Sequence, residues 1–199
     1  DVVQKNWAAI DAGAKQIVEV QVPESWKNAE DEGLFMSHAS HGAQEAQDFV
    51  NNIQCKINAQ EGNSLPVSAF KDYVDGTTPS GTAAYEKRGI AVNVPVWVPD
   101  NCIQCNRCAY VCPHAAIRPV AMTADETANA PEGIKTLPLT GMKDYTFTMT
   151  VSALDCTGCG SCANVCPGKK GNKALEMAPL EANTEEQKFF DYGVTLPQK

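Results

Sequence analysis

The sequence predicts an α+β fold whose central part is built from two similar halves. The first observation is a cysteine run with the spacing C-x-x-C-x-x-C-x-x-x-C-P, which occurs at 102–113 and again at 156–167. The second is that one extended, strand-like segment precedes each run and another follows it. The repeated order of strand, cysteine loop, short helix and strand predicts a module with a pseudo-twofold repeat at 96–180.

Two elements are predicted at the start of the chain, as a small α/β segment. Apolar residues at helical spacing predict a helix at 3–15. Residues 17–22 (IVEVQV) alternate between apolar and polar side chains, which predicts a strand that Pro23 closes. Residues 24–42 are polar and contain glycine, so we expect a loop there.

A second helix is predicted at 43–58, where an apolar stripe recurs at helical spacing. The stripe consists of Phe49, Val50, Ile53 and Ile57. Cys55 lies beside it and has no partner cysteine near it in the sequence. We interpret Cys55 as a small buried side chain and give it no ligand role.

Turn-forming residues dominate 72–89, where three glycines and a proline interrupt any regular element. Residues 90–98 should be extended, with Pro95 marking an edge or irregular strand. The four strands predicted within the module are Val94–Val98, Ala116–Val120, Tyr145–Val151 and Lys173–Met177. Residues 121–144 are an insertion between the halves, and the acidic, then aromatic tail at 181–199 is expected to be a linker that docks elsewhere on a larger protein.

The two cysteine runs have the ligand spacing of a protein with two [4Fe–4S] clusters. Three cysteines at steps of three bring three thiolates to one cluster from a single loop. The fourth, expected on the first turn of a helix, points away and ligates the other cluster. Cluster I is therefore predicted to be held by Cys102, Cys105, Cys108 and Cys166. Cluster II is predicted to be held by Cys156, Cys159, Cys162 and Cys112. The fold class is thus a bacterial-type two-[4Fe–4S] ferredoxin-like module.

Two other uses of these cysteines fit the pattern less well. Zinc ribbons usually pair one C-x-x-C with a second at longer spacing, whereas here three cysteines stand in series. A disulfide framework would leave one of nine cysteines unpaired. The second cysteine of each run is present, as Cys105 and Cys159, which argues against a [3Fe–4S] centre in either half.

Residues between the ligands are consistent with a cluster site. Gly158 and Gly160 permit positive φ, so backbone N–H groups can face cluster sulfurs. Pro113 and Pro167 turn the chain away after the remote ligand. An apolar coat that restricts water is expected from Ile103, Ala109, Val111, Ile117, Ala163 and Val165.

Three lysines, Lys169, Lys170 and Lys173, follow the second run in an otherwise acidic chain. One hypothesis is that they attract an acidic ferredoxin. We favour the simpler interpretation of a solvated loop. For His114 we favour a plain surface or packed side chain over cluster tuning, and for Tyr110 and Trp97 we favour packing over electron relay.

Composition limits the remaining classes. The net charge of −8 argues against nucleic-acid or anionic-membrane partners, and no apolar run is long enough to cross a bilayer. Thiolate ligands suit a reducing cytoplasm, and the chain carries no signal peptide. Because it begins Asp1-Val2-Val3 with no methionine, we expect an excised or processed fragment.

Several stretches resemble pyruvate:ferredoxin (flavodoxin) oxidoreductase. The match is most specific in GTAAYEKRGIAVNVPVWVPDNCIQCNRCAYVCPHAAIRP, which contains the tripeptide Glu86-Lys87-Arg88 of the family's EKR region. It continues in APEGIKTLPL and in VSALDCTGCGSCANVCPGKKGNKALEMAPL. The N-terminal KNWAAIDAGAKQIVEVQVPESW is similar to the end of the family's γ-type domain. The implied division is 1–25 for that γ-type end, 26–95 for the EKR region, 96–180 for the two-cluster domain and 181–199 for a linker.

The resemblance implies a large, oxygen-sensitive enzyme, usually a homodimer, that decarboxylates pyruvate oxidatively with thiamine diphosphate, Mg²⁺ and coenzyme A. Electrons would pass through three [4Fe–4S] clusters to ferredoxin or flavodoxin, and this chain would supply two of the three. Nothing in the chain resembles a thiamine-binding pattern, so no catalytic residue is predicted in it. Three alternatives stay open: an oxidoreductase for a different 2-oxoacid, a free-standing two-cluster carrier, and a structural module.

Overall fold

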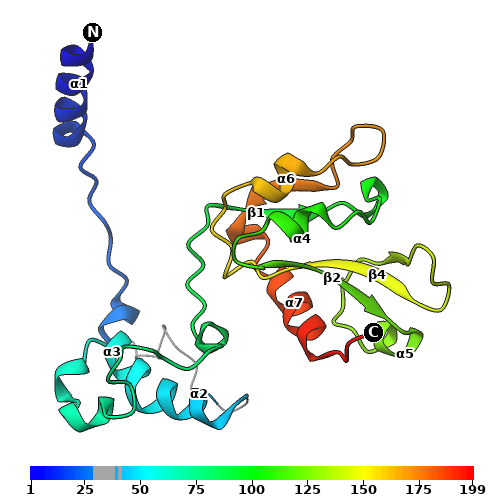
Figure 1. The fold of residues 1–199 in the computed structure, drawn as a ribbon. Helices are drawn as coiled ribbons and strands as arrows, with labels where there is room; N and C mark the ends of the chain where they lie inside the picture. Colours follow the sequence, from blue (N-terminus) through cyan, green and yellow to red (C-terminus); the bar gives the residue numbers. More distant parts are fainter. Residues whose placement is uncertain (29–38, 40–41) are drawn as a thin grey trace. The chain divides into compact units, whose positions relative to one another are not determined.

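The structure is a computed structural model that describes residues 1–28, 39 and 42–199. The chain divides into two compact units, Asp1–Leu34 and Phe35–Lys199 (Figure 1). Residues 29–38 and 40–41 of the loop predicted at 24–42 lie outside the described residues. No helix in the described part of the chain is long and apolar enough to cross a membrane.

In the first unit, helix α1 (Val2–Lys15) confirms the helix predicted at 3–15. The Asp1 carboxylate caps it by accepting a hydrogen bond from the Val3 N–H at 3.1 Å. The strand predicted at 17–22 is wrong, because these residues form no ladder and are exposed. Alternation alone does not make a strand, which needs a neighbour to hydrogen-bond its backbone. A short 3₁₀ helix, Glu24–Asn28, follows.

The helix predicted at 43–58 is confirmed as α2 (Gln44–Phe49), a π-helical turn (Val50–Gln54) and α3 (Cys55–Asn58). Phe49, Val50 and Ile53 of the predicted stripe are buried, but Ile57 is 46% exposed. Cys55 is only partly buried, beside a small cluster that includes Val50 and Tyr85. Burial raises the pKa of the Cys55 thiol, which keeps it neutral.

The turn-rich segment at 72–89 contains turns and a 3₁₀ helix, Thr82–Tyr85, as expected. Two contacts link its end to the second cysteine run. Lys87 pairs with the carboxylate of Asp155, directly before Cys156. The Gly89 N–H donates to the Leu154 carbonyl at 2.9 Å.

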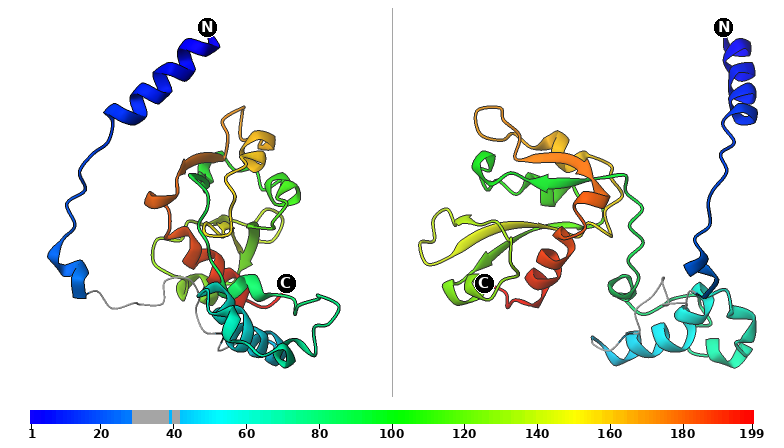
Figure 2. Two further views of the ribbon diagram at one scale, coloured as in Figure 1. Left: turned by 90° about the vertical axis from the view of Figure 1, so that its left-hand side faces the viewer. Right: turned by 180° about the vertical axis from the view of Figure 1, so that it is seen from behind.

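The module contains two antiparallel sheets (Figures 1 and 2). Strand β1 (Asn93–Trp97) pairs with β5 (Leu175–Pro179). Strand β2 (Ile117–Met122) pairs with β4 (Thr146–Val151), and β4 also pairs with the short β3 (Leu137–Pro138). The four predicted strands are confirmed within a few residues. The β1–β5 and β2–β4 pairs each join a strand of the first half to one of the second, so the halves fold as one body.

The insertion at 121–144 contributes β3 and a short helix, α5 (Ala124–Ala128). A capping box starts this helix. The Glu126 N–H donates to Thr123 Oγ1 at 3.2 Å, and the Thr123 N–H donates to Glu126 Oε2 at 2.8 Å. The Thr123 N–H and the Lys199 ammonium hold the pKa of the Glu126 carboxyl below its usual range.

We expect Thr123→Ala to lower the free energy of unfolding by about 1 kcal/mol, because the Glu126 N–H loses its acceptor. Chemical denaturation of the two proteins measures the difference. Thr140→Ala, at an exposed threonine outside any helix start, is the matched control and should be near neutral. Equal effects of the two substitutions would contradict a stabilising cap.

The tail predicted at 181–199 to be a linker docking elsewhere does not behave as one. Helix α7 (Glu186–Thr195) packs against β4 and β2 of the same module (Figures 1 and 2). Phe189 and Phe190 are each 8% exposed. Gln187 Oε1 accepts from the Leu154 N–H at 3.1 Å. The two aromatic rings are buried in this chain, so no larger protein is needed to cover them.

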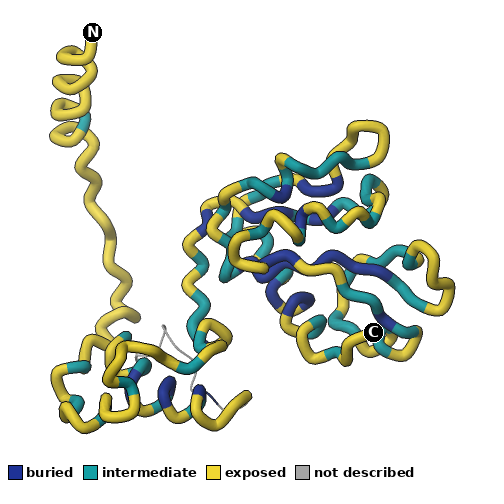
Figure 3. Tube along the Cα trace, viewed as in Figure 1, coloured by how far each residue is buried: buried dark blue, intermediate teal, exposed yellow. Residues whose placement is uncertain are grey.

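The main core lies between the two sheets and contains the cysteine runs. Trp97 and Phe147 pack edge to face with ring centroids 5.9 Å apart. Cys108 and Cys162 are buried within the same cluster. Burial is concentrated on the strands and α7, whereas residues 1–28 are largely exposed (Figure 3). Cys102, Cys112 and Cys166 pack against this core cluster, and Cys156 packs against a smaller neighbouring one, so six of the eight cysteines of the runs lie in or beside the core.

Candidate metal centre

Each cysteine run forms a loop that ends in a five-residue helix, α4 (Arg107–Val111) or α6 (Ser161–Val165). The loops need two left-handed residues each. In the second run these are Gly158 and Gly160, with φ values of 72° and 73°, as the sequence predicted. In the first run Gln104 and Asn106 take the same conformation, with φ values of 57° and 59°. Asparagine tolerates this region better than most residues.

The position predicted for the fourth cysteine of each run is wrong in one respect. Cys112 and Cys166 follow the last turns of α4 and α6 and do not lie on a first turn. The helices end there because the next residue is proline, which excludes helical geometry for the residue before it. Cys112 accordingly has φ −73° and ψ 113°. Leaving the helix directs these side chains toward the opposite half.

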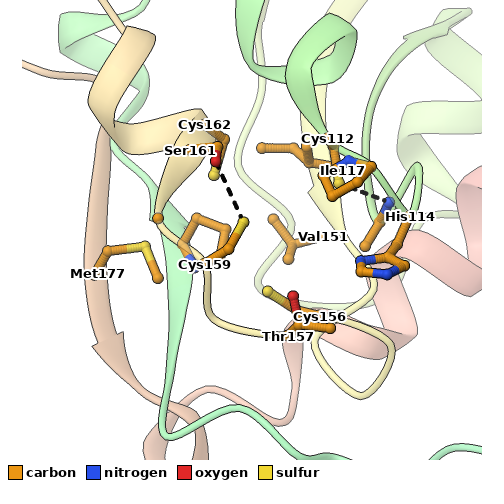
Figure 4. Close-up of a pocket in the computed structure, with 14 residues that line it drawn as sticks. Cys112, His114, Ile117, Val151, Cys156, Thr157, Cys159, Ser161, Cys162 and Met177 are labelled. Carbon is orange, nitrogen blue, oxygen red and sulfur yellow. Dashed lines mark hydrogen bonds between the residues drawn. The ribbon is translucent and has the colours of Figure 1, made fainter.

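Two cavities collect the eight cysteines in a crossed pattern. Cavity I is lined by three cysteines of the first run and the last of the second, namely Cys102, Cys105, Cys108 and Cys166. Cavity II is lined by three of the second run and the last of the first, namely Cys156, Cys159, Cys162 and Cys112 (Figure 4). Among the described residues, no three His, Cys, Asp or Glu side chains are arranged to hold a single metal ion. The thiols stand around a shared space, as ligands of a multi-atom group would.

Backbone N–H groups contact the same sulfurs in both halves. The N–H groups of Gln104 and Gly158 lie 3.4 Å from the sulfurs of Cys102 and Cys156. Those of Ala116 and Ala174 lie 3.3 Å from the sulfurs of Cys112 and Cys166 in a further pair of contacts. Donors fixed in this way favour sulfur that carries negative charge. The chemistry of the cavities therefore fits thiolate ligands.

Burial differs along each run. Cys105 and Cys159 are exposed, whereas Cys108 and Cys162 are buried. Burial raises the pKa of Cys108 to about 12 and that of Cys162 to about 11. These thiols stay neutral at physiological pH unless a cation compensates the thiolate charge, so any metal bound here would have to drive their deprotonation.

Two hydroxyls beside Cys159 were not predicted from the sequence. Ser161 Oγ lies 3.5 Å from the sulfur of Cys159 (Figure 4). Hydrogen bonds from Ser161, and a weaker one from Thr157, hold the pKa of Cys159 below its usual range. An internal alignment of the two cysteine runs could have revealed these hydroxyls, because the first run has Arg107 and Ile103 at the same positions.

The remaining candidates have varied surroundings. Trp97 is a packing residue that also lines cavity I, and its indole nitrogen has no hydrogen-bond partner. Tyr110 is 89% exposed, so a packing role is wrong for it. His114 is an exposed residue at the edge of cavity II.

The three lysines after the second run differ from one another. The Lys173 ammonium donates hydrogen bonds to carbonyl groups of α6, including that of Asn164 at 2.8 Å, so it stabilises that helix end and is not simply a solvated charge. Lys169 and Lys170 are exposed.

The predicted apolar coat is only partly closed. Ile117 is buried at cavity II, and Ile103 lines cavity I but is 50% exposed. Val111 is 38% exposed. Met149 lies beside cavity I and Met177 beside cavity II, and neither was predicted. The isolation of each cavity from water therefore depends on methionines as well as on the residues between the cysteines.

Comparison with known families assigns the class of this centre. Residues 101–170 match the 4Fe-4S dicluster domain family. Residues 37–91 match the EKR family, described as a domain of unknown function. The module is thus a domain of the class that carries two [4Fe–4S] clusters.

The chain as a whole is similar to larger enzymes. It is 46% identical over 198 residues to a pyruvate-flavodoxin oxidoreductase of Enterobacter agglomerans. It is 44% identical over 200 residues to a pyruvate:ferredoxin oxidoreductase of Moorella thermoacetica, and 41% identical over 198 to a pyruvate-flavodoxin oxidoreductase of Klebsiella pneumoniae. The chain belongs to the pyruvate:ferredoxin (flavodoxin) oxidoreductase family. These matches cover 99–100% of the chain but only 16% of each relative.

Proposed function

We propose that this chain is the electron-transfer segment of a pyruvate:ferredoxin oxidoreductase and carries electrons to ferredoxin or flavodoxin. The observation that carries the proposal is the pair of cavities, each lined by four cysteines drawn from both runs. Similarity over the whole of this chain to enzymes named for pyruvate and for ferredoxin or flavodoxin supports these electron acceptors as partners. A free-standing carrier is disfavoured because it would not need residues 1–92, which precede the first strand of the module.

The cysteines of each cavity would form one ligand set. Cys102, Cys105, Cys108 and Cys166 would hold cluster I. Cys156, Cys159, Cys162 and Cys112 would hold cluster II. A [4Fe–4S] cluster accepts and releases one electron at low potential when bound. The matching strand pairs, left-handed loop residues and N–H···S contacts of the two halves support an approximate twofold relation between the sites.

The protein's own part in electron transfer is placement and tuning. Crossed ligands connect the two halves, so the sites keep a fixed separation. Buried Cys108 and Cys162, with Met149 and Met177, restrict water on the inner side of each site. Cys105 and Cys159 are exposed, so each site also has a side that a partner can approach.

Other activities belong to the rest of the proposed enzyme. We infer that thiamine diphosphate, Mg²⁺ and a third [4Fe–4S] cluster are bound outside this chain, in a homodimeric, cytoplasmic protein. Residues 1–25 would be the end of its γ-type domain and 26–95 its EKR region, which agrees with the EKR match at 37–91. The choice of pyruvate over other 2-oxoacids would also be made outside this chain.

Metal analysis of the full-length protein tests the proposal. Compared with a variant in which all eight cysteines of the runs are alanine, the anaerobically prepared protein should bind about eight more iron atoms. Reductive titration should show, by electron paramagnetic resonance, two interacting S = 1/2 signals that the eight-cysteine variant lacks. Pyruvate with coenzyme A should then reduce ferredoxin or flavodoxin only when the cysteines are intact. Zinc in place of iron, or electron delivery without the cysteines, would contradict the proposal.

A further inference from the structure

The two candidate cluster sites differ at one pair of equivalent positions. Ser161 is the first residue of α6 and follows the left-handed Gly160. Arg107 is the first residue of α4 and follows the left-handed Asn106. Each therefore has the same place relative to the exposed second cysteine of its run, Cys159 or Cys105. Only the second run has a hydroxyl there.

The Ser161 hydroxyl is within hydrogen-bonding distance of a ligand sulfur, since its Oγ lies 3.5 Å from the sulfur of Cys159 (Figure 4). A neutral thiol can donate this bond, but a thiolate can only accept. Once Cys159 is a metal ligand, the hydroxyl must therefore be the donor. Thr157 lines the same cavity as Cys159 and offers it a second, weaker hydroxyl, whereas the equivalent residue of the first run is Ile103.

A donor aimed at a ligand sulfur changes the reduction potential because reduction adds negative charge to the cluster and its thiolates. The hydrogen bond is stronger in the more negative state, so it favours reduction. The four backbone N–H···S contacts are matched between the halves and cannot distinguish the sites. The hydroxyls are not matched, so they affect one site alone.

We propose that Ser161, assisted by Thr157, is a tuning residue that raises the reduction potential of cluster II through the sulfur of Cys159. The inference rests on the proposed function, because it requires clusters at both sites. With the hydroxyls present, an electron shared between the two clusters therefore resides at cluster II for a larger fraction of the time.

Redox titration of the full-length protein, followed by electron paramagnetic resonance, tests the inference. Ser161→Ala should lower one midpoint potential and shift the electron distribution between the two clusters three- to tenfold toward cluster I. A tenfold shift corresponds to about 59 mV for a one-electron couple. Thr157→Val should shift the same potential in the same direction by less. Thr184→Ala, an exposed threonine away from both cysteine runs, should shift neither.

A reciprocal pair identifies the cluster. Arg107→Ser adds a hydroxyl at the first site but also removes a charge, and Arg107→Ala removes the charge alone. The potential of cluster I should be higher in Arg107→Ser than in Arg107→Ala. The paramagnetic signal that differs between these two variants should be the one that Ser161→Ala leaves unchanged. The inference would be overturned if Ser161→Ala kept its iron and showed no shift in either midpoint potential. It would also be overturned if Ser161→Ala and Arg107→Ser shifted the potential of the same signal. Loss of the clusters from the wild-type protein would instead refute the proposed function.

Discussion

Cys166→Ala should abolish the cluster held mainly by the first cysteine run, although Cys166 belongs to the second. The structure places Cys166 in cavity I with Cys102, Cys105 and Cys108. Removing it leaves that site with three ligands, while cavity II keeps all four cysteines. The full-length protein should lose about four iron atoms and one of the two paramagnetic signals that depend on the cysteines of the runs.

Double substitutions separate crossed from uncrossed ligation. Cys166→Ala combined with Cys105→Ala removes two ligands of one site, so the loss should stay at about four iron atoms. Cys166→Ala combined with Cys159→Ala removes one ligand from each site, so the loss should rise to about eight. If each run held its own cluster, the two results would be exchanged. Retention of the second signal in the single variant is the control for folding.

The cysteine arrangement could be predicted because its information is local. Three ligands within one loop are fixed by spacing, and the proline after Cys112 or Cys166 marks where the chain turns. The helical position of the fourth cysteine was not predicted correctly, because helix ends depend on the backbone geometry before proline. The Ser161–Cys159 contact was missed for a related reason. Gly160 between them was predicted to permit positive φ, but the distance between the Ser161 hydroxyl and the Cys159 sulfur depends on side-chain positions that the pattern does not contain.

Longer-range features could not be predicted in the same way. Residues 17–22 have the alternation of a strand, but whether they form one depends on a partner that the pattern does not contain. The aromatic residues Phe189 and Phe190 indicated a tail that must be covered, and a larger protein was expected to cover it. The structure covers it with β4 and β2 of the same module. Local patterns thus predicted most of the elements and the grouping of the cysteines, and packing decided which surfaces meet.

Gly168→Ala should be the most damaging single change in the loop after the second run. Gly168 lies two residues after Cys166, lines cavity I, and has φ +58°. A Cβ atom built there would stand 1.7 Å from the carbonyl oxygen of Asn172, which is backbone and cannot rotate away. Backbone strain and overpacking together should cost about 3–5 kcal/mol. The loop must open, so Cys166 should move and cluster I should be lost or become labile.

Gly171→Ala separates this steric effect from the cost of a left-handed backbone. Gly171 has φ +85° in the same loop, but a Cβ atom there would meet nothing within 4 Å. Its substitution should therefore cost only about 1–2 kcal/mol and leave the iron content unchanged. Denaturation midpoints and iron analysis of the two variants give the comparison. Equal losses of stability and iron would contradict the role of the Gly168–Asn172 approach, because only Gly168 faces a backbone atom that an alanine would displace.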